Sequence, residues 1–373
     1  MFEKFRAALA LLYAEGGTAS DCRRIAIDPE ELFDALKNEG GRERVSQLLG
    51  KTIGPVRWEA FDEQLATIER TGAQAVCLWD DGYPDYLHHV AQPPPVLFYR
   101  GSLDPVHRRG VAIVGTRKPS ATGAAMARSL GRELSAIGIP VVSGLARGID
   151  SAAHEGGVSA RGGSVAVVGT GLDIPYPPEN AELLLEVAGN GCAVSEQPMG
   201  TRPHAFVFPL RNRLISAMSH AVVVVEAGER SGALITAKWA LEQGREVGAV
   251  PGFPGDFRSR GVNRLLKQGA FLVENASDVI VSVPRLASVY GLDPAGPEGT
   301  TAASTADRRL SRSALATAEE NRLLSLLGRS PVDVDTLARH AGVEVSAVHR
   351  TLFHLEMAGR VERDSIGRYT RID

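Results

Sequence analysis

The sequence has few cysteines and no long apolar run. Its 373 residues include only Cys22, Cys77 and Cys192, which lie far apart and form no C-x-x-C pair. This count argues against a disulfide framework or a zinc site and is typical of a protein of the reducing cytosol. No apolar run approaches the ~18 residues of a membrane-spanning helix. Residues 1–14 lack a convincing cleavage pattern and predict an amphipathic helix rather than a signal peptide.

The chain also lacks an obvious catalytic nucleophile, a metal-ligating cluster and a paired acid–base set. It contains no G-x-G-x-x-G fingerprint at the first strand of its glycine-rich region, and the second strand there ends in Ser143-Gly144 without an acidic residue. A nicotinamide cofactor is therefore not expected, and no other cofactor or metal is predicted. These absences favour a protein that holds a ligand over an enzyme.

The net charge is small, −3 at pH 7, but the charges are unevenly distributed. Residues 1–99 carry 10 Lys or Arg and 16 Asp or Glu, whereas residues 100–284 carry 19 and 16. The modest positive excess coincides with the glycine-rich centre of the chain. An anionic ligand is therefore expected there.

Apolar periodicity and turn residues divide the chain into four predicted parts. Residues 1–72 predict a small acidic helical domain (SAM- or HhH-like), and residues 285–313 have the Gly, Pro, Ser and Thr content of a flexible linker. Residues 314–373 predict a winged helix, with helices from Glu319, Val334 and Ser346 followed by a β-hairpin. Residues 73–284 alternate apolar strands with helices, which predicts an α/β fold with a doubly wound, mostly parallel, extended Rossmann-like sheet. Strands are expected at 73–78, 96–99, 111–114, 140–143, 164–168, 192–195, 221–225, 247–250 and 270–273.

Glycine-bearing loops follow several of these strands, and basic residues accompany them. Gly115-Thr116-Arg117 comes after the strand at 111–114, and Ser143-Gly144-Leu145-Ala146-Arg147-Gly148 comes at the end of the next strand. Glycine lets a phosphate approach the backbone, arginine supplies charge and a fork of donors, and a helix start offers free N–H groups. In such a sheet ligands bind at the carboxyl ends of the strands. Tight turns with solvated arginines are the alternative interpretation.

Two further segments are candidates for the same site. Phe208-Pro209-Leu210-Arg211-Asn212-Arg213 places two cations around an amide at a helix start, and Ser231-Gly232 opens another helix. Phe208 could stack on a base, although Phe206 and Phe208 could equally belong to the core. Ser231 could cap its helix or bind a phosphate.

Asp150 and His154 are spaced i, i+4 on the helix that follows Arg147. A catalytic dyad is conceivable, but no nucleophile or metal ligand completes it, so a capping or structural role is favoured. In the tail, Ser346, His349, Arg350 and His354 form a weakly basic third helix. This helix could contact duplex DNA or protein.

The ordered motifs resemble the DprA family (DNA-processing protein A, also called Smf). The resemblance covers roughly residues 83–273, and its residues are Tyr83-Pro84, 94–98, Gly115-Thr116-Arg117, 143–154, 169–173, Tyr176-Pro177, Asn180, Ser195-Glu196, 208–213, 225–227, 231–237, Gly244-Arg245 and 250–252. The resemblance implies a cytosolic, non-enzymatic protein of natural transformation that binds single-stranded DNA without sequence preference. It also implies a homodimer formed through the Rossmann-like domain and the loading of RecA recombinase onto incoming strands. By the same resemblance Arg117 and Arg147 would hold phosphates, and Arg211 and Arg213 would line their pocket.

A nucleotide-binding enzyme, such as a phosphoribohydrolase, is the alternative function. Related Rossmann-like sheets host such activity, and Glu226 with His154 could be recruited for it. However, residues 226–232 stand where such enzymes carry a Gly-Gly-x-Gly-Thr motif. Single-strand binding is therefore the preferred hypothesis.

Overall fold

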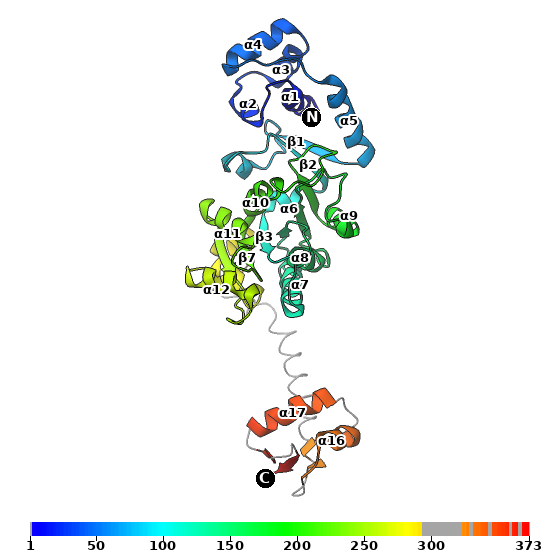
Figure 1. Cartoon of the computed structure of the whole chain (residues 1–373), viewed down its shortest axis with the longest axis vertical. Helices are drawn as coiled ribbons and strands as arrows, with labels where there is room; N and C mark the ends of the chain where they lie inside the picture. The colour runs from blue at the N-terminus through cyan, green and yellow to red at the C-terminus, as the bar shows by residue number, and fades with distance from the viewer. Residues whose placement is uncertain are drawn as a thin grey trace. The chain divides into compact units, whose positions relative to one another are not determined.

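The computed structural model describes residues 2–292 and, beyond them, residues 323–324, 326–327, 331–341, 345–357, 360–364 and 368–372. The chain divides into two compact units, Met1–Gly296 and Pro297–Asp373 (Figure 1). Within these described residues, no helix is both long and apolar enough to cross a membrane.

Five helices precede the sheet, in the part of the chain that the sequence predicts to be helical: α1 (Phe2–Tyr13), α2 (Ala19–Arg24), α3 (Pro29–Leu36), α4 (Glu39–Leu49) and α5 (Trp58–Thr71). Local chemistry sets their ends. The Asp28 side chain accepts hydrogen bonds from two backbone N–H groups at the start of α3, and Gly50 ends α4 at a φ of 67°. Phe5 of α1 packs edge-on against Phe98 of the sheet, with ring centroids 6.3 Å apart. The helices and the sheet therefore share a hydrophobic core.

The sheet has nine strands in the spatial order β1-β2-β6-β5-β4-β3-β7-β8-β9. Their bounds are β1 (Gln74–Cys77), β2 (Val96–Gly101), β3 (Gly110–Val114), β4 (Val141–Ser143), β5 (Ser164–Val167), β6 (Cys192–Ser195), β7 (Ser219–Val224), β8 (Glu246–Ala249) and β9 (Phe271–Leu272). β1 and β2 pair antiparallel, β2 pairs antiparallel with β6, and the strands from β6 to β9 in this order are parallel. The predicted strands and the mostly parallel sheet are confirmed.

Helices cover both faces of the sheet (Figure 1). Val111 and Ile113 of β3 belong to one buried cluster with residues of α7 and α8, whereas Ala112 and Val114 belong to another with residues of α10 and α11. Because successive side chains of a strand point to opposite faces, this division confirms a doubly wound fold. The helices of this region are α6 (Asp104–Arg108), α7 (Ala121–Ala136), α8 (Ile149–Val158), α9 (Ala181–Gly189), α10 (Val207–Ala217), α11 (Ala233–Glu242), α12 (Arg260–Lys267), α13 (Ala276–Ser282) and α14 (Pro284–Tyr290), with short 3-10 turns η1 (Asp85–His89), η2 (Pro178–Asn180) and η3 (Phe257–Ser259).

The start of the predicted linker is wrong. Residues 285–290 belong to α14, because Leu286 and Ala287 are buried in the cluster that contains α7 and α8. The rest of the predicted linker from residue 293 lies outside the described residues.

The described part of the second unit contains α16 (Val334–Ala341), α17 (Val345–Met357) and an antiparallel hairpin of β10 (Val361–Arg363) and β11 (Tyr369–Arg371). Leu323, Leu337, Leu352 and Tyr369 share its core. Two predicted helices and the hairpin are confirmed, and the helix expected from Glu319 is only partly described. His349 is exposed, whereas the side chains of Ser346, Arg350 and His354 are outside the described ones.

Candidate functional site

The chain changes direction across the sheet at β3. From β3 it proceeds outward through β4, β5 and β6 and then returns to place β7 on the other side of β3. At such a switch point the loops after the two neighbouring strands diverge, which opens a crevice at the carboxyl edge. A cavity of about 680 Å³ lies there, and we call it the switch-point cavity. Of the predicted site residues, it is lined by Gly115, Arg117, Phe208, Arg211, Asn212, Ser231 and Gly232.

The loops after β3 and β4 touch each other beside this cavity. The backbone N–H of Ile149 donates to the carbonyl of Thr116 at 3.2 Å. Gly148 has a φ of 85° and lies so close to the Thr116 carbonyl that no side chain would fit. Gly144 and Arg147 line a small hollow that also includes Arg117. The two loops that were predicted to hold phosphates therefore lie side by side.

Arg117 is the most available cation of the predicted set. Its side chain is exposed, and within the described residues it forms no hydrogen bond or ion pair. Its guanidinium carbon lies 5.7 Å from the centre of the Phe208 ring. Phe208 is half-buried and also neighbours Tyr176, with ring centroids 5.5 Å apart. A cation–π contact orients the guanidinium plane and leaves its N–H donors available to an anion.

The loop after β4 has an unusual backbone that buried polar groups hold in place. Leu145 is fully buried at a φ of 55°, a conformation that is unfavourable for a bulky side chain. Its N–H donates to Nε2 of His154 at 3.3 Å, and its carbonyl accepts from Asn180 at 2.8 Å. The Asp150 carboxylate accepts from the N–H of Gly144 at 3.2 Å. The loop is therefore preorganised rather than adaptable.

The geometry of His154 assigns its tautomer. Ser164 Oγ donates to the carbonyl of Val141 at 2.8 Å, so it accepts from Nδ1 of His154 at 2.7 Å, which leaves Nε2 as the acceptor for Leu145. Burial, followed by the charge of Arg211, lowers the pKa of His154 to about 3 and keeps the ring neutral. Burial raises the pKa of Asp150 to about 6, against the effect of Arg211 and nearby backbone N–H groups. Both residues thus serve the loop, in agreement with the structural role favoured by the sequence.

Arg211 lines the cavity, but its guanidinium already donates hydrogen bonds to backbone carbonyls. Only 5% of it is exposed, and its Nη1 donates to the carbonyls of Gly144, at 2.6 Å, and of Val167. Burial lowers its pKa to about 10. Gly144 must be glycine because a Cβ would lie 2.7 Å from Arg211 Nη2. Arg211 therefore joins the ends of β4 and β5 and adds positive charge below the cavity.

Arg147 and Arg213 both have acidic partners. Exposed Arg147 forms an ion pair with Glu179, which raises the pKa of the guanidinium and lowers that of the carboxyl. Buried Arg213 pairs with Glu196 and does not line the switch-point cavity. Ser143 is also buried and donates to the carbonyl of Ile113 at 2.6 Å. A phosphate would have to displace Glu179 from Arg147, and the structure gives it no direct access to Arg213 or Ser143.

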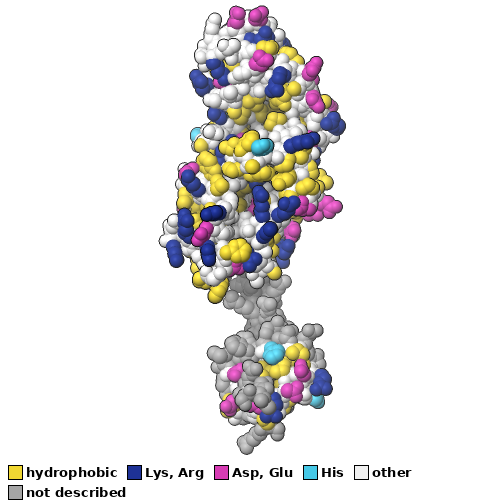
Figure 2. Space-filling model, viewed as in Figure 1, with side chains coloured by type: hydrophobic (Ala, Val, Ile, Leu, Met, Phe, Trp, Pro, Cys, Tyr) yellow, Lys and Arg dark blue, Asp and Glu magenta, His cyan; other side chains and the backbone are white. Residues whose placement is uncertain are grey.

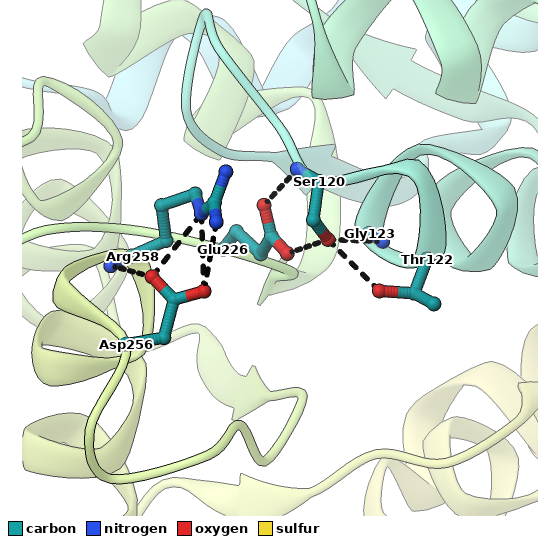
Figure 3. Close-up of polar contacts among 6 residues, drawn as sticks. All are labelled: Ser120, Thr122, Gly123, Glu226, Asp256 and Arg258. Carbon is teal, nitrogen blue, oxygen red and sulfur yellow. Dashed lines mark hydrogen bonds and ion pairs between the residues drawn. The ribbon is translucent and has the colours of Figure 1, made fainter.

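The start of α7, where the sequence predicts free N–H groups for an anion, is partly occupied by the chain itself. Glu226, from the loop after β7, accepts from the backbone N–H of Ser120 at 2.9 Å, and Ser120 Oγ caps the N–H of Gly123 at 2.9 Å (Figure 3). A carboxylate of the chain itself thus takes the anion position at the positive end of this helix. Figure 3 shows the Arg258–Asp256 pair beside Glu226.

Two loops contribute residues that sequence reasoning did not assign to the site. Tyr176, from the loop after β5, and His204, before α10, line the switch-point cavity. Phe206 is 63% exposed and so does not belong to the core, and its ring centroid lies 4.5 Å from that of His204. On the face shown in Figure 2, Lys and Arg side chains lie over the part of the first unit that carries α8, α11 and α12, beside exposed hydrophobic side chains. Exposed aromatic side chains beside cations were the signal that could have assigned these residues to the site.

Two family models match this sequence: DNA recombination-mediator protein A over residues 74–284, and the DprA winged helix domain over residues 301–365. A protein Smf of Synechocystis sp. is 42% identical over 55% of this chain, which spans about half (52%) of that relative. A putative DNA processing protein DprA of Mycobacterium tuberculosis is 39% identical over 92% of this chain and 88% of its own length.

Two solved structures share the fold. DNA processing protein A from Streptococcus pneumoniae superposes with a TM-score of 0.57 and 32% identity, over 71% of this chain and 96% of that one. DNA processing protein A from Helicobacter pylori was solved in a study of its single-stranded DNA binding mode. It superposes with a TM-score of 0.52 and 29% identity, over 57% of this chain and 96% of that one.

Proposed function

We propose that this chain, which belongs to the DNA recombination-mediator protein A family (DprA or Smf), acts as a DNA-processing recombination mediator. We further propose that it binds single-stranded DNA along the switch-point cavity. The Helicobacter pylori relative, whose single-stranded DNA binding mode has been studied, supports this ligand. The observation that carries the proposal is Arg117, an exposed cation without an ion-pair partner among the described residues, placed over an aromatic ring at the switch point. Phosphate contacts of this kind do not depend on sequence.

The residues of the proposed site differ in how freely their side chains can contact a strand. Arg117 holds a phosphate directly, whereas Arg147 does so after it exchanges Glu179 for the strand. Arg211 contributes charge and fixes the loop of Gly144. Phe208, His204 and Phe206 offer rings on which bases can stack, a contact that every base can make.

From the family we further propose that the bound strand is protected, that RecA is loaded onto it during natural transformation in the cytoplasm, and that the protein acts as a homodimer through its Rossmann-like domain. We assign it no catalytic role. Glu226 and His154, the residues considered for a hydrolase, are engaged by Ser120 and by Leu145 with Ser164. The winged helix is proposed to contact duplex DNA or protein.

Gel-shift titrations with oligo-dT, a duplex and an RNA of equal length test the proposal. We expect the tightest binding to oligo-dT, equal affinity for other single-stranded sequences, and a steep loss of affinity with added salt. A preference for the duplex, or binding that does not respond to salt, would refute it. Release of a free base from nucleoside monophosphates by the pure protein would favour the enzyme instead.

A further inference from the structure

A second basic cluster lies at the opposite edge of the sheet, where the parallel strands begin. Arg109 directly precedes β3, Arg245 directly precedes β8, and His220 lies at the start of β7 between them. The register pairs Gly110 with Ser219 and Val111 with Ala221, so His220 bulges out of the pairing. On the other side of β7, Ala221 pairs with Glu246. Three basic residues therefore start from adjacent positions of one edge.

α14 adds a fourth basic residue. The hydroxyl of Tyr290 donates to the backbone carbonyl of Arg109, which ties α14 to this edge, and Arg285 lies near the start of the same helix. The guanidinium of Arg109 lies 3.9 Å from the centre of the Tyr86 ring, which fixes its plane. We call the three arginines of this edge, Arg109, Arg245 and Arg285, the amino-edge cluster.

Among residues 2–292, no carboxylate forms an ion pair with the amino-edge cluster. Within residues 2–292, the side chains of Arg109, Arg245 and Arg285 form no hydrogen bond and no ion pair. Nε of Arg245 is buried without a partner among the described residues. His220, only 7% exposed, donates its Nε2–H to the carbonyl of Arg108 at 3.3 Å, and burial lowers its pKa to about 4, so its ring is neutral and it separates the arginines without adding charge. Burial and the neighbouring arginines lower the pKa of Arg109 to about 10 and also lower that of Arg245.

This arrangement is unfavourable on its own. Partly buried like charges repel one another, and unpartnered buried polar atoms cost free energy. A tetrahedral oxyanion would supply the missing negative charge and several acceptor oxygens, and guanidinium forks match such an anion. We propose that the amino-edge cluster binds a phosphate group, at a site separate from the switch-point cavity. The phosphate is either a free phosphate or part of a nucleic-acid backbone.

Titration calorimetry with inorganic phosphate tests this site, in the Arg117→Ala background so that the switch-point cavity does not contribute. The variants Arg245→Gln and Arg285→Gln each remove one charge of the cluster. Arg6→Gln removes the same charge elsewhere, at an exposed position of α1. We expect saturable binding by the parent and by Arg6→Gln, and a loss of roughly tenfold or more in affinity for the two cluster variants. No saturable binding by the parent, or equal affinity in all four proteins, would overturn the site.

Melting in a phosphate-free, low-salt buffer separates binding from a structural role. Arg285→Gln removes a repulsive charge, so this variant should melt at or above the melting temperature of the parent. Added phosphate should raise the melting temperature of the parent more than that of Arg285→Gln. A lower melting temperature with unchanged phosphate affinity would contradict the proposal. Competition then identifies the source: oligo-dT without a terminal phosphate displaces inorganic phosphate if the ligand is a backbone and fails to do so if it is a free phosphate. Both results support the site, and neither depends on DNA binding by Arg117.

Discussion

Replacing Glu179 by glutamine should tighten the binding of single-stranded DNA. In the free protein Glu179 holds the guanidinium of Arg147, and a strand must displace this carboxylate to use that cation. Both side chains are about half exposed (52% and 50%), so solvent screens the pair and its loss is a modest effect. We expect an affinity gain of about two- to fivefold at low salt, because exposed ion pairs are weak. Added salt should shrink the gain.

Fluorescence anisotropy with labelled oligo-dT measures the effect. Glu186→Gln is the matched control, because it removes an exposed carboxylate from α9, the helix that follows the 3-10 turn of Glu179. In an Arg147→Ala background the gain from Glu179→Gln should largely vanish, since no guanidinium remains to be released. An unchanged or weaker affinity for Glu179→Gln, or an equal gain in both backgrounds, would refute the competition between Glu179 and the strand.

Three further variants test the supporting structure. Gly144→Ala puts a Cβ against buried Arg211 and should lower the free energy of unfolding by about 1–3 kcal/mol in urea titrations, whereas an unchanged value would contradict the packing. His154 has a folded pKa of about 3, so below pH 6.5 the unfolded chain binds the extra proton, and stability should fall by about 1.4 kcal/mol per pH unit from this residue. His154→Gln should flatten that slope between pH 6.5 and 5, and parallel stability curves would show that His154 does not cause it. Phe206→Ala should leave the melting temperature unchanged and weaken oligo-dT binding by about 1 kcal/mol or more, and full affinity would exclude stacking on this ring.

The sequence was sufficient to predict the sheet because its strands are short apolar runs separated by amphipathic helices. The run at 111–114 is buried on both faces, as expected for a central parallel strand. The same pattern placed Gly115 and Gly144 at strand ends and Gly232 at a helix start, and Gly115 and Gly232 line the same cavity at the carboxyl edge, beside the hollow that Gly144 lines. The helix at 285–290 was missed because its neighbours are rich in Gly and Pro, and only its burial against the sheet defines it.

The partners of the cations could not be predicted, because they come from distant segments. Nothing near Arg211 in the sequence indicates that Gly144 and Val167 accept its hydrogen bonds, or that Glu196 pairs with Arg213. Strand order decides these contacts, since the return of the chain from β6 to β7 creates the switch point. The amino-edge cluster depends on the same order.

The most direct test of the proposed interface is the salt dependence of oligo-dT binding by Arg117→Ala. Arg132→Ala is the matched control, because it removes an exposed arginine of α7, the helix that follows the loop of Arg117. The proposal predicts that Arg117→Ala weakens binding roughly tenfold or more, because a charge-assisted phosphate contact is lost. It also predicts a slope of log K against log salt that is shallower by about 0.7, while the control keeps both values. Unchanged affinity and slope in a folded Arg117→Ala protein would contradict single-strand binding at the switch-point cavity.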